Sequence, residues 1–350
     1  MTDEAYDQLA EALGRLPNGF ARTTSGVEIS ILKRIFTPTE TALAGGLTLN
    51  KESPTAIAGR LRRDIGETER ILVDMADRDL VWSYEMDGKT VFRLAPFVVG
   101  IYEAQLGIMD HEFAHMIEQF LDEGGAVGMM RPQPALHRIV PAQKAVKSEW
   151  IMPYDDVRML LMQSKTFRLR DCICRVQQDH IGRKCDFPIR SCLSFATEEQ
   201  LPNKNGISQK EALEFLDDAE RIGLIHSVSN VAKGVNYVCN CCGCCCGIVR
   251  AINDWGIEKS VAASNYYAVI DPGECLGCLT CVDRCQVKAI TEVDGHAVVN
   301  REKCIGCGLC VTGCANEVAR LERKPASETV EPPADFAAWE VERLRNRGIA

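Results

Sequence analysis

Eight cysteines near the end of the sequence constrain this chain more than any other feature. They form two runs, ECLGCLTCVDRC and KCIGCGLCVTGC, and each has the spacing C-x2-C-x2-C-x3-C. Thiolates are soft ligands that favour iron–sulfur clusters and zinc. In such a run the first three thiolates bind one [4Fe-4S] cluster and the fourth binds the neighbouring cluster. The spacing therefore predicts two cross-ligated clusters, one on Cys275, Cys278, Cys281 and Cys314 and the other on Cys304, Cys307, Cys310 and Cys285.

Residues 264–322 resemble the bacterial two-cluster ferredoxins. The eight cysteine positions carry the resemblance, and the strand-like segments YYAVID and HAVVN before the two runs also fit that fold. The family usually has proline after each fourth cysteine, whereas this sequence has Gln286 and Ala315. Because proline fixes the backbone and lacks an N–H, we expect these replacements to keep the ligation but to change hydrogen bonding near the sulfurs. Structural zinc is the alternative for paired cysteines, but two matched runs favour clusters.

Ten further cysteines lie in two segments, RDCICRVQQDHIGRKCDFPIRSCLSF and VCNCCGCCCGIVRAI, with a predicted amphipathic helix between them. The segments resemble a module found beside ferredoxin domains in anaerobic bacteria and archaea, marked by C-x-C-R and C-C-x-C-C-C. Adjacent cysteines of an extended chain point in different directions, and a cubane has only four corners. We therefore expect the two segments to fold together and share ligands. The candidate metal ligands are Cys172, Cys174, Cys185, Cys192, Cys239, Cys241, Cys242, Cys244, Cys245 and Cys246.

The chemistry of these ten thiols stays open at the level of sequence. They are enough for one or two further iron–sulfur clusters, and zinc is the alternative. Disulfides are not expected in a reducing compartment. Arg175, Arg183 and Lys184 lie near the first segment, where they would offset thiolate charge or attract an anionic partner.

The first third of the chain is acidic. Residues 1–130 contain 21 acidic and 12 basic side chains, which accounts for the whole net charge of −9. Residues 26–95 are predicted to form short helices followed by a β-hairpin around Asp87–Gly88, an order that resembles a winged-helix domain. DNA binding needs clustered positive charge, but the candidate recognition helix at 66–80 is mostly acidic. We expect this domain to dock on protein rather than on DNA.

A helix predicted over 98–121 contains His111-Glu112-Phe113-Ala114-His115. This matches H-E-x-x-H, in which two histidines one turn apart bind zinc and the glutamate activates water. No histidine follows at the spacing of the longer form of the motif. Polar residues on an amphipathic helix explain the segment equally well, so the sequence leaves metal binding here undecided.

These segments predict an α+β chain with three folded parts. A winged-helix-like domain with a long helix (1–125) is followed by a cysteine-rich iron–sulfur domain (131–262) and a two-cluster ferredoxin domain (263–325), with a Gly- and Pro-rich linker expected over 124–134. Residues 326–350 are predicted to be a polar linker and an amphipathic helix, which either docks on a neighbouring protein or folds back on its own chain.

The remaining features narrow the function. The acidic start lacks the apolar core of a signal peptide, and no run of apolar residues is long enough to span a membrane. We therefore expect a cytoplasmic, reducing and anaerobic setting, because exposed thiolates oxidise readily. No dinucleotide fingerprint or phosphate loop occurs, so we expect an electron-transfer subunit working between a donor and a partner oxidoreductase. The alternatives are an iron–sulfur reductase with catalysis at a middle-domain cluster, and a redox-responsive DNA-binding regulator.

Overall fold

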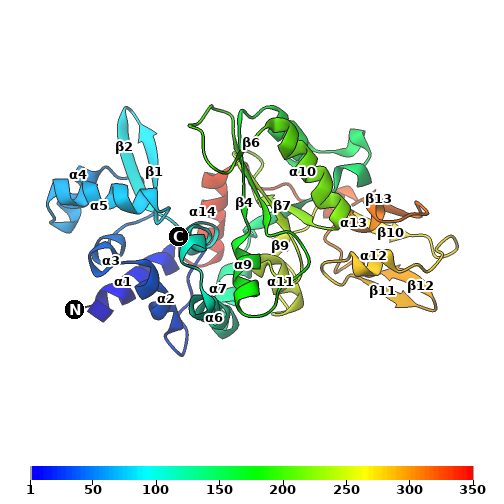
Figure 1. Ribbon diagram of the computed structural model, residues 1–350, viewed down its shortest axis with the longest axis horizontal. Coiled ribbons are helices and arrows are strands. Elements are labelled where there is room, and N and C mark those ends of the chain that lie inside the picture. Colours follow the sequence, from blue (N-terminus) through cyan, green and yellow to red (C-terminus); the bar gives the residue numbers. More distant parts are fainter. Residues whose placement is uncertain (1, 350) are drawn as a thin grey trace. The chain divides into compact units, whose positions relative to one another are not determined.

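The computed structural model describes residues 2–349, which divide into two compact units (Figure 1). Unit 1 joins the residues up to 132 with 176–182 and the residues from 343 onward, and unit 2 joins 133–175 with 183–342. All the cysteines of the two cysteine-rich segments and of the ferredoxin segment thus belong to unit 2, and the finer domain boundaries remain predictions from sequence. The mixture of helices and strands agrees with the α+β class.

Unit 1 begins with short helices and a hairpin (blue to cyan in Figure 1). Strands β1 and β2 pair antiparallel around Asp87 and Gly88, whose φ angles of 51° and 70° suit the tight turn of a two-residue hairpin. The predicted hairpin is confirmed, whereas the winged-helix assignment stays a prediction. The elements are α1 (Thr2–Arg15), α2 (Val27–Ile35), α3 (Pro38–Ala44), α4 (Pro54–Leu61), α5 (Ile65–Asp77), β1 (Val81–Met86) and β2 (Lys89–Leu94).

The single helix predicted over 98–121 is wrong. Its start at Val98 and Val99 has extended backbone, and the chain is extended again at Met109 and Asp110. The Asp110 carboxylate accepts a hydrogen bond of 2.9 Å from the backbone N–H of Phe113, so that a new helix begins at His111. The linker expected over 124–134 is also wrong in part, because it contains a helix whose apolar side chains are buried. The elements are η1 (Phe97–Ile101), η2 (Tyr102–Ile108), α6 (His111–Phe120), η3 (Leu121–Gly125) and α7 (Ala126–Met130).

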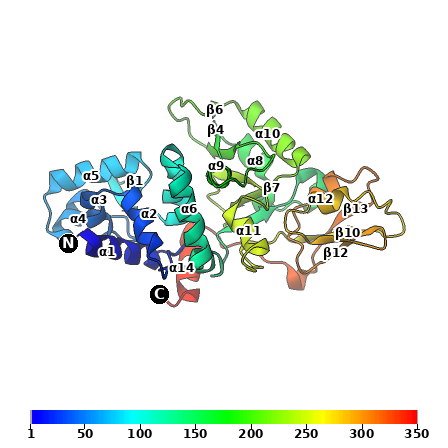
Figure 2. The same cartoon turned by 60° about the horizontal axis from the view of Figure 1, so that its bottom comes forward.

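Unit 2 is built on a seven-stranded sheet with the order β6-β4-β5-β8-β7-β3-β9. Strands β4, β6 and β7 of this sheet are labelled in Figure 2. All neighbouring strands are antiparallel except β3 and β9, which are parallel. The strands are β3 (His137–Val140), β4 (Thr166–Asp171), β5 (Arg190–Ala196), β6 (Gly206–Ile207), β7 (Ile225–Ser229), β8 (Tyr237–Cys241) and β9 (Val261–Ala262).

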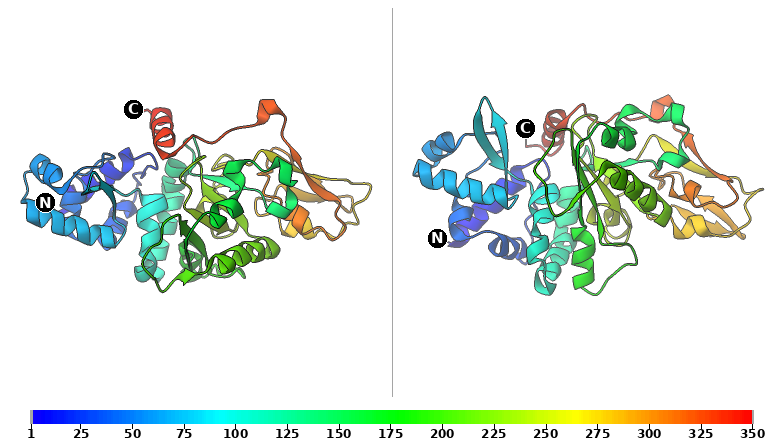
Figure 3. Two further views of the ribbon diagram at one scale, coloured as in Figure 1. Left: turned by 90° about the horizontal axis from the view of Figure 1, so that it is seen from above. Right: turned by 45° about the horizontal axis from the view of Figure 1, so that its top comes forward.

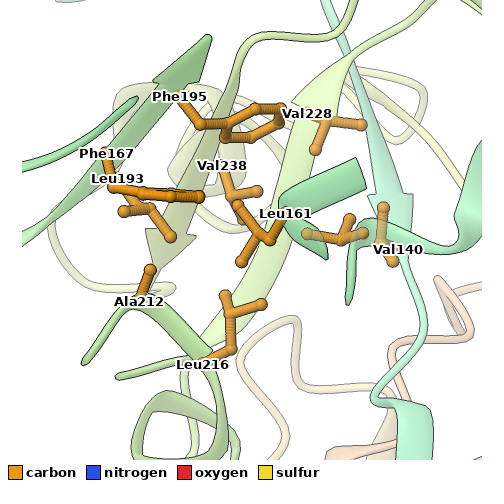
Figure 4. Packing of buried hydrophobic residues seen from close by; sticks show 10 residues of the cluster. Val140, Leu161, Phe167, Leu193, Phe195, Ala212, Leu216, Val228 and Val238 are labelled. Atoms are coloured by element: carbon orange, nitrogen blue, oxygen red, sulfur yellow. The ribbon is translucent and has the colours of Figure 1, made fainter. Parts of the chain in front are cut away.

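The two faces of this sheet carry different chemistry, because successive residues of a strand point to opposite sides. One face packs an apolar core against α8 (Val157–Met162) and α10 (Gln209–Ile222), including Phe167, Leu193, Leu216 and Val238 (Figure 4). The other face presents Cys192 of β5 and its register partner Cys239 of β8, together with Cys241.

Helix α10 is the amphipathic helix predicted between the two cysteine-rich segments. Ser208 and Glu211 form a capping box at its start, and Gly223, with φ 96°, ends it in the left-handed conformation. The other short helices of unit 2 are η4 (Gln143–Ala145), η5 (Ser148–Trp150), η6 (Pro153–Asp155), α11 (Gly247–Asn253) and η7 (Ala326–Glu328), and α9 (Ile173–His180) begins in unit 2 and ends in unit 1.

The ferredoxin segment contains two short antiparallel pairs, β10 with β13 and β11 with β12 (Figure 3, yellow to orange). The strands predicted at YYAVID and HAVVN are confirmed as β10 and β12. Tyr266, Ala268, Ile290 and Leu321 are buried between the pairs. The elements are β10 (Tyr266–Ile270), α12 (Thr280–Asp283), β11 (Ile290–Val293), β12 (His296–Val299), α13 (Leu309–Thr312) and β13 (Ala319–Arg323).

The C-terminal helix α14 (Phe336–Asn346) folds back on its own chain. Within unit 2, Trp339 is buried and its Nε1 donates a 3.0 Å hydrogen bond to the carbonyl of Ala135. Within unit 1, the fully buried Arg343 donates to the carbonyls of Pro17, Met129 and Pro132. None of the helices between residues 2 and 349 combines the length and the apolar character needed to cross a bilayer.

Candidate metal centres

The two cysteine runs of the ferredoxin segment have the same backbone path. Gly277 and Gly306 occupy equivalent positions with φ 66° and 68°, and Leu279 and Gly308 follow with φ 60° and 77°. A Cβ atom on Gly277 would lie 2.2 Å from the carbonyl oxygen of Gly295, so a side chain at this position would collide with the backbone. The repeated left-handed turns wind each run around a common point, as ligands of one cluster require.

Four cysteines from both runs line one pocket. Cys275, Cys278 and Cys281 of the first run meet Cys314 of the second, and Leu279 and Val318 are among the residues that complete the wall. This is the set predicted for the first cluster. The donor set of four thiols around one pocket fits a [4Fe-4S] cluster, and the crossed ligation itself stays a prediction.

The other four cysteines also come together across the two runs. Burial raises the pKa of the Cys307 thiol to about 12, and the neighbouring thiols of Cys304 and Cys285 add to the increase. Ligation requires the thiolate, so a metal that binds Cys307 would have to displace this proton. Backbone N–H groups of Ala289 and Ala268 donate to the sulfurs of Cys285 (3.1 Å) and Cys304 (3.4 Å). Such bonds help to set the reduction potential of a cluster.

Residues 267–315 match the 4Fe-4S dicluster domain family. The matched span contains all eight cysteines of the two runs, so this part of the chain is a ferredoxin-type dicluster domain. No curated protein and no solved structure matches the chain. The middle cysteines are therefore described below by their contacts with the dicluster domain.

The ten middle cysteines separate into two groups, each built from both sequence segments. The first, the four-cysteine group, consists of Cys185, Cys242, Cys244 and Cys245, whose sulfurs all lie within 4.8 Å of one another. The Cys245 sulfur lies 3.4 Å from that of Cys185 and 3.8 Å from that of Cys244. The group packs beside Ala219 and Leu224, which give it an apolar wall.

The second group is a connected series of six thiols, the six-cysteine group: Cys172, Cys174, Cys192, Cys239, Cys241 and Cys246. Cys192 and Cys239 are neighbours on β5 and β8, and a hydrogen bond from Cys239 lowers the pKa of Cys192 to about 7. Hydrogen bonds from Cys239 and Cys246 lower the pKa of Cys241 to about 6. Cys174 continues the series, because its thiol interacts by hydrogen bonding with those of Cys172 and Cys246.

Arg175 is the buried cation of this region. Its guanidinium donates to the carbonyls of Pro188 (3.0 Å) and Asn240 (2.9 Å). Burial by itself lowers the pKa of Arg175, but the thiols of Cys242 and Cys172 raise it overall. A buried charge is stable when a neighbour of opposite charge balances it, so thiolates suit this position. Arg183 and Lys184 are instead exposed to solvent.

Gln286, the residue after Cys285, joins the dicluster domain to the middle cysteines. Its side-chain oxygen accepts a 2.7 Å hydrogen bond from the N–H of Gly243, and its side-chain nitrogen donates at 3.0 Å to the carbonyl of Gly223. A Cβ on Gly243 would lie 1.9 Å from the backbone oxygen of Gln286. Sequence reasoning missed this contact, and the one signal for it was a glutamine where the family usually has proline.

Arg284, on the other side of Cys285, binds the end of α10. It donates to the carbonyls of Glu220 (2.8 Å), Arg221 (2.9 Å) and Leu309 (2.8 Å). The last carbonyls of a helix lack partners within the helix and favour a cation. The residues on both sides of Cys285 therefore hold the end of α10 and the loop of Gly243 in place.

A hydrogen-bonded series leads from Tyr237 to the six-cysteine group. The Tyr237 hydroxyl lies 2.8 Å from Nε2 of His137, and Nδ1 of His137 lies 3.1 Å from the Ser227 hydroxyl. The Ser227 hydroxyl in turn lies 3.5 Å from the Cys241 sulfur. Burial lowers the pKa of His137 to about 4, so its imidazole is neutral at pH 7. A neutral imidazole between two hydroxyls can accept a proton on one nitrogen and release one from the other.

The H-E-x-x-H segment lies at the start of α6. Nδ1 of His111 is 2.7 Å from the carbonyl of His180, and the ring centroids of His111 and His115 are 4.5 Å apart. Glu112 extends into solvent near Arg34. Within residues 2–349, no third cysteine, histidine or carboxylate joins the two histidines in a group compact enough to hold an ion.

Proposed function

We propose that this chain is an iron–sulfur electron-transfer protein, in which electrons pass between the dicluster domain and the middle cysteine groups on their way to or from a separate oxidoreductase. The hydrogen bond between Gln286 and Gly243 carries the proposal. Gln286 adjoins Cys285, and Gly243 lies between Cys242 and Cys244. The ligands of two candidate centres are thus connected through one side chain.

The protein supplies the environment for this transfer. When bound, [4Fe-4S] clusters accept and release one electron at a time. The backbone N–H groups of Ala268 and Ala289 donate to the sulfurs of Cys304 and Cys285, and the buried Arg175 offsets thiolate charge in the middle region. These groups favour the reduced, more negative state of the nearby centres.

Electrons would enter or leave at the first cluster site. Cys278 is exposed, and the neighbouring Leu276 is 75% exposed. An exposed apolar side chain beside a cluster suits transient docking of another redox protein, because small interfaces are typical of such encounters. The acidic unit 1 is a second candidate surface for protein docking, and its negative charge disfavours nucleic acid.

The test uses the full chain, purified anaerobically, and a variant of the junction. Flash reduction of the clusters should be followed by redistribution of electrons to a middle centre, observed by spectroscopy on each centre. Gly243→Ala should slow this step, because the new methyl group would displace Gln286. Gly59→Ala is the matched control, since a methyl group there meets no neighbour within 4 Å. A middle region that never exchanges electrons with the clusters would refute the proposal.

A second candidate function is favoured by the series from Tyr237 to Cys241. Reduction of a disulfide substrate to two thiols consumes two electrons and two protons, and the series offers a path for protons to the six-cysteine group. In this reading the chain is itself an iron–sulfur reductase. His137→Gln should then abolish disulfide reduction by the reduced protein while its iron content stays unchanged. If His137→Gln lost iron in proportion to its lost disulfide reduction, the proton path would not be the cause and this interpretation would be wrong.

A further inference from the structure

We propose that Cys185, Cys242, Cys244 and Cys245 bind a single metal ion, zinc or iron, in a tetrathiolate site that contains no sulfide. The site is distinct from the six-cysteine group and from the two clusters of the dicluster domain. The loop from Cys241 to Cys246 would then supply ligands both to this single-ion site and to the six-cysteine group.

The spacing of the sulfurs points to one ion. Four thiolates around one tetrahedral ion, with metal–sulfur bonds of about 2.3 Å, lie about 3.8 Å apart. The two distances observed, 3.4 Å and 3.8 Å, agree with this, and all four sulfurs lie within 4.8 Å of one another. A cubane cluster holds its thiolates farther apart, because each binds a different iron atom.

The dicluster domain provides a comparison within the same chain. Each of its two predicted ligand sets also contains four cysteines. Within the part of the chain that is described, residues 2–349, neither set brings three or more sulfurs within 4.8 Å of one another as the four-cysteine group does. The compact group therefore differs from the cysteines to which clusters are assigned, although all are thiols of one molecule.

The neighbours of the four ligands separate them from the other thiols. Cys241 precedes Cys242 but its thiol interacts by hydrogen bonding with Cys239 and Cys246, and Cys246 follows Cys245 but its thiol interacts in the same way with Cys174. The loop thus directs its outer cysteines to the six-cysteine group and its inner three to Cys185. Four ligands saturate a tetrahedral ion and leave no open position, as is typical of structural rather than catalytic sites.

The surroundings fit the charge of such a site. Four thiolates and one divalent ion carry two net negative charges, and Arg175, only 3% exposed, interacts with Cys242. Ala219 and Leu224 exclude water from the other side. Negative charge retained by a tetrathiolate site beside this buried guanidinium gives each charge a partner of opposite sign.

The ion would act as a structural cross-link between two loops. It would fasten the loop of Cys185 to the loop of Cys242–Cys245 and so fix the N–H of Gly243 against Gln286. With zinc the four-cysteine group would be redox-inert, and with iron it would be an additional one-electron site. This effect on electron transfer rests on the proposed function, whereas the presence of the ion does not.

The test counts zinc, iron and acid-labile sulfide in the full chain purified anaerobically. Cys185→Ser should lose one metal ion per chain and no sulfide. The matched control is Cys278→Ser in the dicluster domain, which should lose iron and sulfide together. Loss of sulfide in Cys185→Ser, or an unchanged metal count, would overturn the proposal.

A second pair of variants covers the case in which Cys185→Ser fails to fold. Cys244 is the exposed member of the group, so its replacement perturbs packing least. Cys244→His should retain the ion, because three cysteines and one histidine also bind it tetrahedrally, whereas Cys244→Ser should lose it to a chelator at least tenfold faster. If both variants keep the ion equally well, Cys244 is not a ligand and the site is wrong. The metal that is counted distinguishes zinc from iron, and neither result depends on electron transfer.

Discussion

The side-chain oxygen of Gln286 accepts a hydrogen bond of 2.7 Å from the backbone N–H of Gly243. The two residues are 43 positions apart, one beside a predicted cluster ligand and the other within the four-cysteine group. Proline at position 286 would lack both polar atoms of the side chain. The departure from the usual ferredoxin pattern is therefore what permits the junction.

Gln286→Pro should weaken the junction without removing either cluster. The variant loses the hydrogen bonds to Gly243 and Gly223, and we expect unit 2 to be destabilised by about 1–3 kcal/mol, as for partly buried hydrogen bonds left unpaired. Chemical denaturation of the anaerobic protein measures this. Ala315→Pro makes the same change after the other fourth cysteine and should have a much smaller effect. Equal effects of the two substitutions would show that the junction contributes nothing.

Cys314→Ser should damage the cluster predicted on Cys275, Cys278 and Cys281, although Cys314 belongs to the other run. The reason is that Cys314 lines the same pocket as those three cysteines. Cys285→Ser should damage the other cluster. Iron counts with electron paramagnetic resonance of each variant distinguish the two clusters. If Cys314→Ser instead spared the first cluster and removed the second, the crossed ligation would be wrong.

His137→Gln should make stability less dependent on pH. Burial lowers the pKa of His137 from 6.5 to about 4, so between these values the unfolded chain binds more protons than the folded one. Stability from this group is therefore complete at high pH and is lost as the pH falls from 6.5 towards 4, by about 2 kcal/mol between pH 8 and pH 5. Denaturation at both pH values measures the loss, which the variant should lack.

His115→Gln is the control for this experiment, since His115 is exposed to solvent. It should leave the difference between pH 8 and pH 5 as in the parent protein. A His137→Gln variant with the parent's full pH dependence would show that the buried imidazole is not its source.

Arg343→Ala should destabilise unit 1 strongly. Arg343 is fully buried and donates to three backbone carbonyls, those of Pro17, Met129 and Pro132. Removing the guanidinium leaves these acceptors without that partner, at a cost of about 3 kcal/mol or more. Arg345→Ala, two residues away on the exposed side of α14, should change stability by less than about 0.5 kcal/mol. Thermal unfolding of both variants tests the difference, and similar melting temperatures would contradict it.

The dicluster domain was predictable because its chemistry is encoded locally. Spacing places Cys275, Cys278 and Cys281 around one point, and the strands on either side follow ordinary patterns. The same holds for α10, which Ser208 and Gly223 begin and end as their residue types predict. By contrast, the periodicity of 98–121 resembles that of one helix, but Val98 is extended and the extended Met109 and the cap at Asp110 divide the rest.

The division of the ten middle cysteines could not be read from the sequence. It depends on the register that sets Cys192 opposite Cys239, and on the fold of the loop that brings Cys185 to Cys245. The sequence predicts that the two segments share ligands, but not that they do so in two separate groups. The contact of Gln286 with Gly243 joins segments with no common pattern, so no local signal describes it.

The loop from Cys241 to Cys246 also limits how this protein can evolve. Its cysteines are divided between two ligand groups, with the outer Cys241 and Cys246 in one and the inner Cys242, Cys244 and Cys245 in the other. Removing or adding a single residue here would shift the cysteines along the loop, so that ligands of one group would be placed at the other. A substitution at one position harms one group alone. Natural variants of this chain should therefore differ freely in loop length elsewhere, but keep these six positions without insertion or deletion.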